Sequence, residues 1–281
     1  MYGALENIDE TGDNLIVFCD SKLVDSRLIR DIGNGDESSP FLIGLTSFSL
    51  LNSYASLQEN DRISTVIHVD STPNIVRFFS IVYCCTSQRR EKDISWIISY
   101  VKRAYLEKNS ISFVPRFVMS DADDAQFNAC QQQLIHTKFV MGWFHVAKNA
   151  EKLCKGLLDI TTNMVFRDLN KLYCCTTAQG YVDKRNRILS AWKSAAEFYQ
   201  QIRSVYQSLK TEWMVDGRGR PSRFSCWQIY HSPTGSASTD NPVETYHKTL
   251  KLVNKSSNAS PTELVDRLDK SRISFLGSIK M

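Results

Sequence analysis

Three carboxylates stand at the expected end of a strand or the expected start of a helix. Acidic residues at such positions are candidates for a catalytic or metal-binding site. Asp70 and Asp121 each follow a short apolar run, and Glu244 follows a Ser/Thr/Gly-rich loop near the start of an expected helix. Ligands collect at the carboxyl ends of strands in an α/β sheet, so the two aspartates can share a site across 51 residues (121 − 70). Three such groups can hold two Mg²⁺ ions about 3.5–4 Å apart for an in-line phosphoryl displacement. The alternative is that all three are helix caps and partners of helix dipoles.

Other polar and aromatic residues near these positions have simpler explanations. Asp123 and Asp124 precede an expected helix, so capping and dipole complementarity account for them. His145 is expected to be a packed histidine at a helix start rather than a ligand. A small basic cluster could contact phosphates, but a solvated loop explains it better: Lys210, Arg218, Arg220 and Arg223. Four aromatic residues at helical spacing are assigned to packing rather than to base stacking: Trp192, Phe198, Tyr199 and Tyr206.

The composition is that of an ordinary globular chain. The 281 residues carry 34 Lys+Arg and 30 Asp+Glu, a net charge of +4, and 42% of them are hydrophobic. These values exclude collagen, coiled coil and disorder, and they allow binding to a polyanion without requiring it. The most apolar window, residues 41–57, is interrupted by polar residues, and residues 1–14 are acidic. We therefore expect no membrane span and no secretory signal, which places the protein inside the cell.

The eight cysteines are expected to be reduced thiols. They include the adjacent pairs Cys84–Cys85 and Cys174–Cys175, but they form no C-x-x-C motif. None of the five histidines stands at zinc-finger spacing from a cysteine pair, so core packing is favoured over a zinc site.

The elements that must position the carboxylates alternate between strand and helix. β-Branched and apolar runs predict strands at 63–69, 75–85, 116–119 and 139–141, and a short apolar run at 15–19 belongs to the N-terminal flank. Helical spacing predicts helices at 93–106, with Asp93 as N-cap, at 125–134 and at 143–158. This alternation is typical of an α/β layer with a partly parallel sheet.

The later part of the chain reads as helical. Apolar spacing with few helix breakers predicts a helix over 187–213, followed by loops at 216–222 and 232–239. A further helix is expected over 241–252, and a capping box, Ser260 to Glu263 with Pro261 at the first helical position, opens the last one.

Four ordered segments resemble the transposase domain of Mutator-like elements, a DDE-type group with an RNase H-like fold. The segments are VIHVDST, RFVMSDADDAQFNAC, MGWFHVAKN and STDNPVETYHKTLK, within residues 40–251. The chain departs from this family at Gly142, where the family has the cysteine of its Cys-x-x-His motif and this chain keeps only His145. It also departs between Asp70 and Asp93, where one predicted strand stands in place of two.

The resemblance implies a fold and a domain order. It implies an RNase H-like mixed sheet with flanking helices and an α-helical insertion before the last catalytic helix. Residues 1–60 are then an N-terminal flank, with truncation of that flank left open, and 61–158 are the α/β core. Residues 159–236 are the helical insertion, and the C-terminal helices of 237–281 complete the core.

The resemblance also implies an activity. Asp70, Asp121 and Glu244 would be the catalytic triad and would bind two Mg²⁺ or Mn²⁺ ions, for cleavage of DNA strands and their transfer to target DNA. The implied partners are transposon ends and target DNA, with a homo-oligomer as an option, and the implied location is the nucleus. Two alternatives stay open: an RNase H-like nuclease without strand transfer, and an inactive transposase-derived module that binds DNA or protein.

Overall fold

A computed structural model describes residues 5–8, 14–60, 64–69, 81–233 and 261–279. The strands are β1 (Leu5–Ile8), β2 (Asn14–Val24), β3 (Arg27–Asp31), β4 (Leu42–Ser47), β5 (Val66–Val69), β6 (Tyr83–Thr86), β7 (Phe117–Ser120) and β8 (Lys138–Met141). The helices are α1 (Phe48–Gln58), α2 (Glu91–Asn109), α3 (Asp124–Gln133), α4 (Trp143–Cys154), α5 (Asp159–Tyr173), α6 (Ala178–Phe198), α7 (Gln200–Trp213), the short 3₁₀ helix η1 (Ile229–His231) and α9 (Pro261–Ile279).

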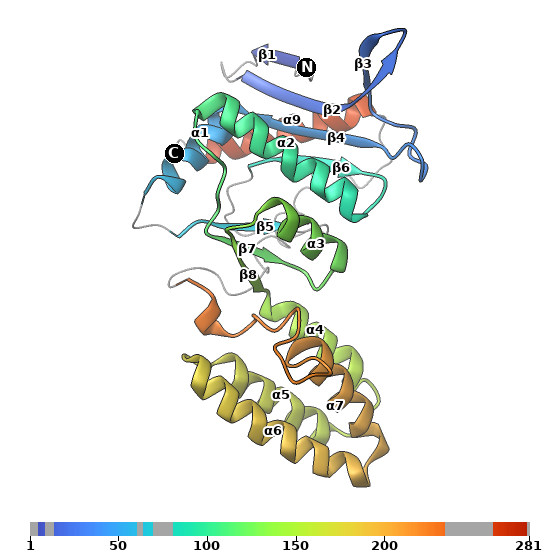
Figure 1. Ribbon diagram of the computed structural model, residues 1–281, viewed down its shortest axis with the longest axis vertical. Helices are drawn as coiled ribbons and strands as arrows, with labels where there is room; N and C mark the ends of the chain where they lie inside the picture. Colours follow the sequence, from blue (N-terminus) through green and yellow to red (C-terminus); the bar gives the residue numbers. More distant parts are fainter. Residues whose placement is uncertain (1–4, 9–13, 61–63, 70–80, 234–260, 280–281) are drawn as a thin grey trace.

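An antiparallel sheet occupies one end of the molecule (Figure 1), with strand order β1-β2-β4-β6 and β3 paired to β2. Successive residues of β2 point to opposite faces, as strand geometry requires. Ile16 and Phe18 pack with α1 and α2, whereas Leu15 packs with β4 and α9 on the other face. The sheet is therefore covered by helices on both faces.

A second sheet of three parallel strands lies in the middle of the molecule, in the order β5-β7-β8. Its register pairs Val69 with Ser120, and Ser120 with Met141. The carboxyl ends of all three strands consequently meet at one edge. Parallel and antiparallel pairing both occur, and the chain is a mixed α/β protein as expected, but the described strands form two sheets.

Helices α4 to α7 form a separate layer at the far end from the antiparallel sheet (Figure 1). They share one hydrophobic cluster, which includes Val146 of α4, Leu169 of α5, Trp192 of α6 and Val205 of α7. The expected helix over 143–158 ends earlier, at Cys154, and α5 begins at Asp159. Helix α4 therefore packs with the region predicted as an insertion and connects it to the parallel sheet.

Residues 187–213 are helical as predicted, but the chain turns at Tyr199, so the stretch is divided between α6 and α7. The backbone of Tyr199 is extended, with φ −124 and ψ 103, and the turn allows both helices to place apolar residues in the same cluster. Phe198 and Tyr199 stand at the turn and are 81% and 64% exposed, so their assignment to packing was wrong. Trp192 and Tyr206 are buried as predicted.

The start of α2 also differs from expectation. The N-cap is Arg90 rather than Asp93, and Asp93 is the third residue of the helix, where its carboxylate accepts a hydrogen bond from the Arg90 backbone N–H at 3.2 Å. Asp93 is 2% exposed and forms an ion pair with Arg90. A carboxylate at this position stabilises the helix start as well as a cap does, which is why the sequence pattern did not separate the two.

Residues expected in an N-terminal flank contribute to the core. Phe18 of β2 stacks on Tyr100 of α2 with ring centroids 3.9 Å apart, and Tyr54 of α1 contacts Tyr105 of α2. Pro261 opens α9 as predicted, whereas the helix expected at 241–252 lies outside the described residues. Among the helices of the described ranges, none combines the length and apolar character needed to cross a bilayer.

Candidate functional site

The carboxyl edge of the parallel sheet is where the sequence predicts a site built from carboxylates. Strand β7 ends at Ser120, so Asp121 is the first residue beyond the edge. Strand β5 ends at Val69, which pairs with Ser120, and Asp70 follows it in the sequence. Asp70 and Glu244 both lie outside the described residues, so the structure places only Asp121 of the predicted triad.

Asp121 is brought against His145. The distance from His145 Nε2 to Asp121 Oδ1 is 2.8 Å, and the two side chains are 19% and 17% exposed. The pair has the distance of a hydrogen bond, yet Asp121 Oδ1 is buried and makes no well-directed hydrogen bond within the described chain. The two side chains are therefore in direct contact at the edge of the sheet.

The position of His145 follows from how α4 begins. Strand β8 ends at Met141, beside Ser120, and Gly142 is the N-cap of α4. His145 is the third residue of the helix, and its backbone N–H donates to the Gly142 carbonyl at 3.2 Å. Its side chain thus projects from the first turn of a helix that starts at the same edge as Asp121. The sequence pattern had favoured a packed histidine here, and only the alignment of β7 with β8 reveals the contact.

The carboxylates next to Asp121 serve other purposes. Asp123 is the N-cap of α3 and accepts a hydrogen bond from the Gln126 backbone N–H at 2.9 Å, as predicted. Asp124 forms an ion pair with Arg223, whose guanidinium lies 5.2 Å from the centre of the Phe127 ring. These contacts account for both residues without a metal.

Arg223 belongs to a segment that returns from the helical layer to the parallel sheet. The Cys226 carbonyl accepts a hydrogen bond from the Met141 N–H at 2.9 Å, and Trp227 stacks on Trp143 with ring centroids 5.5 Å apart. The chain therefore comes back beside the end of β8 before it enters the segment that contains Glu244.

Arg218 and Arg220 fit the predicted solvated loop, whereas Lys210 of the same basic cluster lies in α7. Asp216 accepts hydrogen bonds from the Arg218 and Arg220 backbone N–H groups and pairs with the Arg220 guanidinium at 2.9 Å. The backbone hydrogen bond from Arg220 is the largest of the interactions that lower the pKa of Asp216. These two arginines are thus organised around their own turn.

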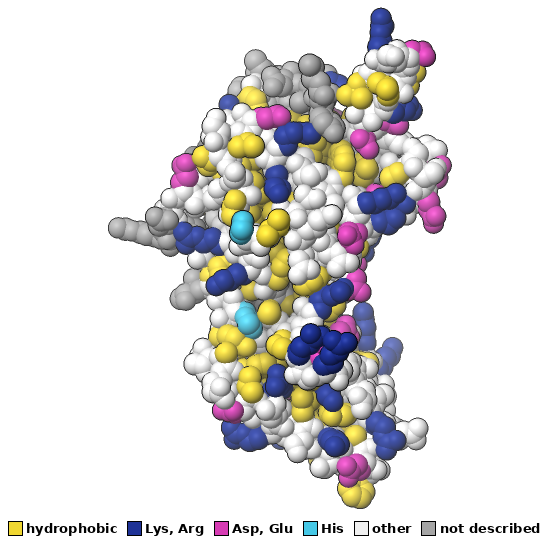
Figure 2. Space-filling view, viewed as in Figure 1, with side chains coloured by type: hydrophobic (Ala, Val, Ile, Leu, Met, Phe, Trp, Pro, Cys, Tyr) yellow, Lys and Arg dark blue, Asp and Glu magenta, His cyan; other side chains and the backbone are white. Residues whose placement is uncertain are grey.

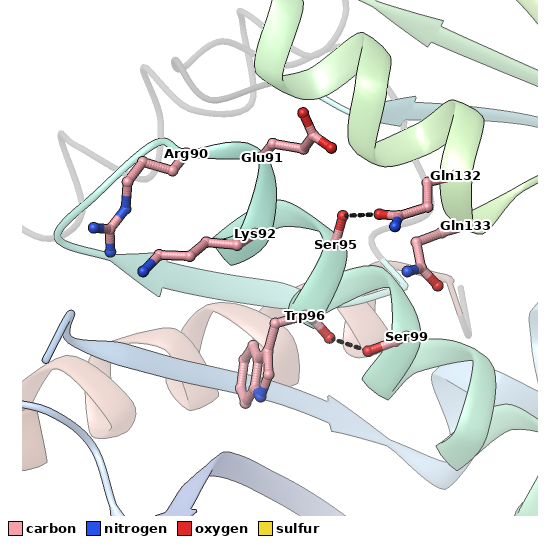
Figure 3. A pocket seen from close by; sticks show the side chains of 8 residues that line it. All are labelled: Arg90, Glu91, Lys92, Ser95, Trp96, Ser99, Gln132 and Gln133. Carbon is pink, nitrogen blue, oxygen red and sulfur yellow. Dashed lines mark hydrogen bonds between the residues drawn. The ribbon is translucent and has the colours of Figure 1, made fainter. Parts of the chain in front are cut away.

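Two grooves elsewhere on the described part of the chain do not adjoin Asp121. One of about 640 Å³ lies between α2 and α3 (Figure 3) and is lined by Arg90, Glu91, Lys92, Ser95, Trp96, Ser99, Gln132 and Gln133. Ser95 donates to the Gln132 side chain at 3.1 Å across it. The other, next to the end of α2, contains Phe113 and Leu134.

The donor chemistry at Asp121 fits a hard divalent cation, because Mg²⁺ takes carboxylate oxygens as ligands and Asp121 places a half-buried carboxylate at this edge. Within the described ranges, no cluster of three or more His, Cys, Asp or Glu residues could hold a metal ion. Two of the three predicted ligands lie outside those ranges.

The chain matches no family model, no curated protein and no solved structure.

Proposed function

We propose that this chain is a DDE-type transposase domain of the Mutator-like class, with an RNase H-like fold, that cleaves and joins DNA strands with the help of divalent metal ions. The observation that carries the proposal is the parallel pairing of β5 with β7, in which Val69 and Ser120 are partners. The residues that follow them in the sequence are Asp70 and Asp121. Neighbouring parallel strands that end in aspartate are what a shared acidic site requires.

In this proposal Asp70, Asp121 and Glu244 hold two Mg²⁺ or Mn²⁺ ions. When bound, such ions stabilise charge on the attacking and leaving oxygens of a phosphoryl displacement. The chain's own contribution is to hold the carboxylates in place. His145 fixes the orientation of the Asp121 carboxylate from α4, and the segment around Trp227 directs the chain back toward β8 ahead of Glu244.

The proposal implies partners and a location. The substrates are transposon ends and target DNA, and a transposase that acts on chromosomal DNA works in the nucleus. The net charge of +4 is compatible with a nucleic acid partner but does not require one.

The test is Mn²⁺ binding by calorimetry, with short duplex DNA present because phosphates normally complete such a site. We expect Asp121→Asn and Glu244→Gln each to abolish binding. Asp124→Asn is the matched control: it neutralises a carboxylate three residues from Asp121 that is engaged with Arg223. That variant should bind Mn²⁺ like the parent chain.

Two outcomes would contradict the proposal. If a folded parent chain binds no Mn²⁺, the protein is an inactive relative whose partners must be sought directly. If Mn²⁺ binds and a labelled DNA is hydrolysed without any joined product, the chain is a nuclease without strand transfer.

A further inference from the structure

The strands β2 and β3 form a hairpin that extends beyond the antiparallel sheet (Figure 1). The first half of β2 pairs with β1 and β4, whereas residues 20–24 pair only with β3. The two-residue turn at Asp25 and Ser26 has positive φ values of 47 and 62, which matches the right-handed twist of the hairpin. The projection is therefore a regular ribbon.

The hairpin exposes four large aliphatic side chains. Leu23 is 71% exposed, Leu28 50%, Ile29 41% and Val24 40%. Figure 2 shows apolar side chains on this projection with charged side chains around them. An exposed apolar ribbon of this kind pairs with another chain or promotes aggregation, so it indicates an interaction site.

Strand β3 has one edge without a partner among the described strands, because it pairs there with β2 alone. The pair Val24–Arg27 closes the turn, and hydrogen-bonded pairs alternate along an antiparallel ladder, so Ile29 directs its backbone groups toward Lys22 of β2. The outward backbone groups then belong to Leu28 and Arg30.

We propose that β3 pairs with β3 of a second copy of this chain, antiparallel and centred on Ile29. The sequence of β3, Arg-Leu-Ile-Arg-Asp, is complementary to itself in this register. Arg27 of each copy stands opposite Asp31 of the other, and the two Ile29 side chains meet at the two-fold axis. A two-fold interface requires such a self-complementary surface.

The neighbouring registers are worse. A shift by one residue in one direction places Arg27 opposite Arg30, and a shift in the other places Leu28 opposite Asp31. Like charges directly opposite each other destabilise a strand pair, and opposite charges stabilise it. Of these three registers, only the one centred on Ile29 sets Arg27 opposite Asp31 and lets the outward backbone groups of Leu28 and Arg30 exchange hydrogen bonds across the interface.

This inference does not depend on the proposed transposase activity. Each copy contributes a five-residue strand and the aliphatic side chains of its hairpin, so the dimer is small and reversible rather than permanent. Its formation joins the two antiparallel sheets into one continuous sheet.

Disulfide trapping tests the geometry. At the centre of the interface Ile29 forms a pair without backbone hydrogen bonds, in which the two Cα atoms are about 4.5 Å apart. An Ile29→Cys chain should form a covalent dimer under mild oxidation. Leu23→Cys is the matched control, because it is more exposed but lies on β2, three strand spacings or about 14 Å from its copy, beyond disulfide reach. The unchanged chain measures how much covalent dimer forms through the cysteines that the protein already has.

Charge exchange tests the register. By sedimentation, Arg27→Asp alone and Asp31→Arg alone should each dimerise about tenfold more weakly than the parent, because each brings like charges face to face twice. A mixture of the two variants should regain the parent's affinity, since every pair is then of opposite charge.

The proposal is overturned if the parent chain stays monomeric at every concentration, or if Leu23→Cys is trapped as readily as Ile29→Cys. It is also overturned if both charge variants dimerise as tightly as the parent, or if mixing the two variants does not raise the affinity; the hairpin would then serve a different protein.

Discussion

At the scale of single residues, the contact between Asp121 and His145 is the one with a direct chemical consequence. The histidine comes from the first turn of α4 and the aspartate from the end of β7, so two elements must be aligned to bring them to 2.8 Å. A residue that contacts and orients a metal-ligating side chain contributes to metal affinity without binding the metal itself.

We therefore predict that His145→Ala lowers the affinity for Mn²⁺ by about 10- to 100-fold, the usual effect of losing such a supporting residue. Calorimetry in the presence of duplex DNA measures this. His145→Gln keeps a hydrogen-bond donor on a side chain of similar reach and should recover part of the affinity. Equal Mn²⁺ affinities for the parent chain and the His145→Ala variant would show that His145 does not position the Asp121 carboxylate.

Asp168 is a second residue with a measurable role, in the helical layer. Its carboxylate is 8% exposed and accepts hydrogen bonds from Trp192 Nε1 and Lys171 Nζ, both at 3.1 Å. Asp168→Ala leaves the buried Trp192 N–H without this partner, which should cost about 1–3 kcal/mol of unfolding free energy. Denaturant titration at neutral pH checks it, with the exposed Asp183→Ala on α6 as the control, expected within about 0.5 kcal/mol of the parent.

The same carboxylate makes stability depend on pH. Burial acts to raise the pKa of Asp168, but hydrogen bonds from Arg167, Lys171 and Trp192 outweigh it and hold the pKa below its ordinary 3.8. The unfolded chain then takes up a proton first as the pH falls. The contribution of the Asp168 carboxylate to stability is complete above about pH 4 and is lost as the pH falls through its folded-state pKa. Thermal unfolding measures this: as the pH falls through this acid range, the Asp168→Asn variant should lose less stability than the parent chain. An equal loss in both would contradict the proposed role of the Asp168 carboxylate.

At the scale of elements, β4 can lie beside β2 only because residue 44 is glycine. Gly44 is paired with Phe18, and a Cβ built on Gly44 would lie 2.1 Å from the Phe18 ring. The ring is itself stacked on Tyr100, so it has little freedom to move. The absence of a side chain at position 44 thus allows α2 to pack on the sheet through an aromatic stack.

Gly44→Ala should therefore lower the free energy of unfolding by about 1–3 kcal/mol, the usual cost of overpacking. Phe18→Leu combined with Gly44→Ala should cost less than the sum of the two single changes, because the smaller side chain relieves the clash. Gly217→Ala is the control, since no atom lies within 4 Å of the position its Cβ would take. Additive effects in the double variant would contradict the proposed contact.

At the scale of the whole molecule, Trp227 anchors the segment that returns to β8 in the helical layer. It is 2% exposed, stacks on Trp143 at the start of α4, and donates from Nε1 to the Trp213 carbonyl at the end of α7 at 2.7 Å. A single side chain thus contacts both ends of the layer at the place where the chain returns to β8.

We predict that Trp227→Ala costs about 3–5 kcal/mol of unfolding free energy, as for other large buried aromatic residues. Trp227→Phe keeps an apolar ring but loses the hydrogen bond, and should cost less. Chemical denaturation followed by near-ultraviolet circular dichroism measures both. An alanine variant as stable as the parent would show that the layer is held by its other contacts, such as the bond from Trp213 Nε1 to Asn149.

Local patterns in the sequence located most of the described elements of the α/β region. β-Branched runs marked β5, β7 and β8, and Asp123 was recognised as the cap of α3, because strand preference and capping depend on neighbouring residues. The patterns failed where the answer depended on distant partners. Phe198 and Tyr199 have the spacing of core residues, yet they are exposed at a turn that lets α6 fold back on α7.

The sequence by itself determined the mixed α/β class and the strands on either side of Asp121. Only the tertiary structure decided that His145 lies on Asp121, that residues 14–58 pack into the core, and that β3 pairs with β2 alone among the described strands. The physical reason is that side-chain periodicity records which face of an element is apolar, whereas strand register and helix packing decide which faces meet.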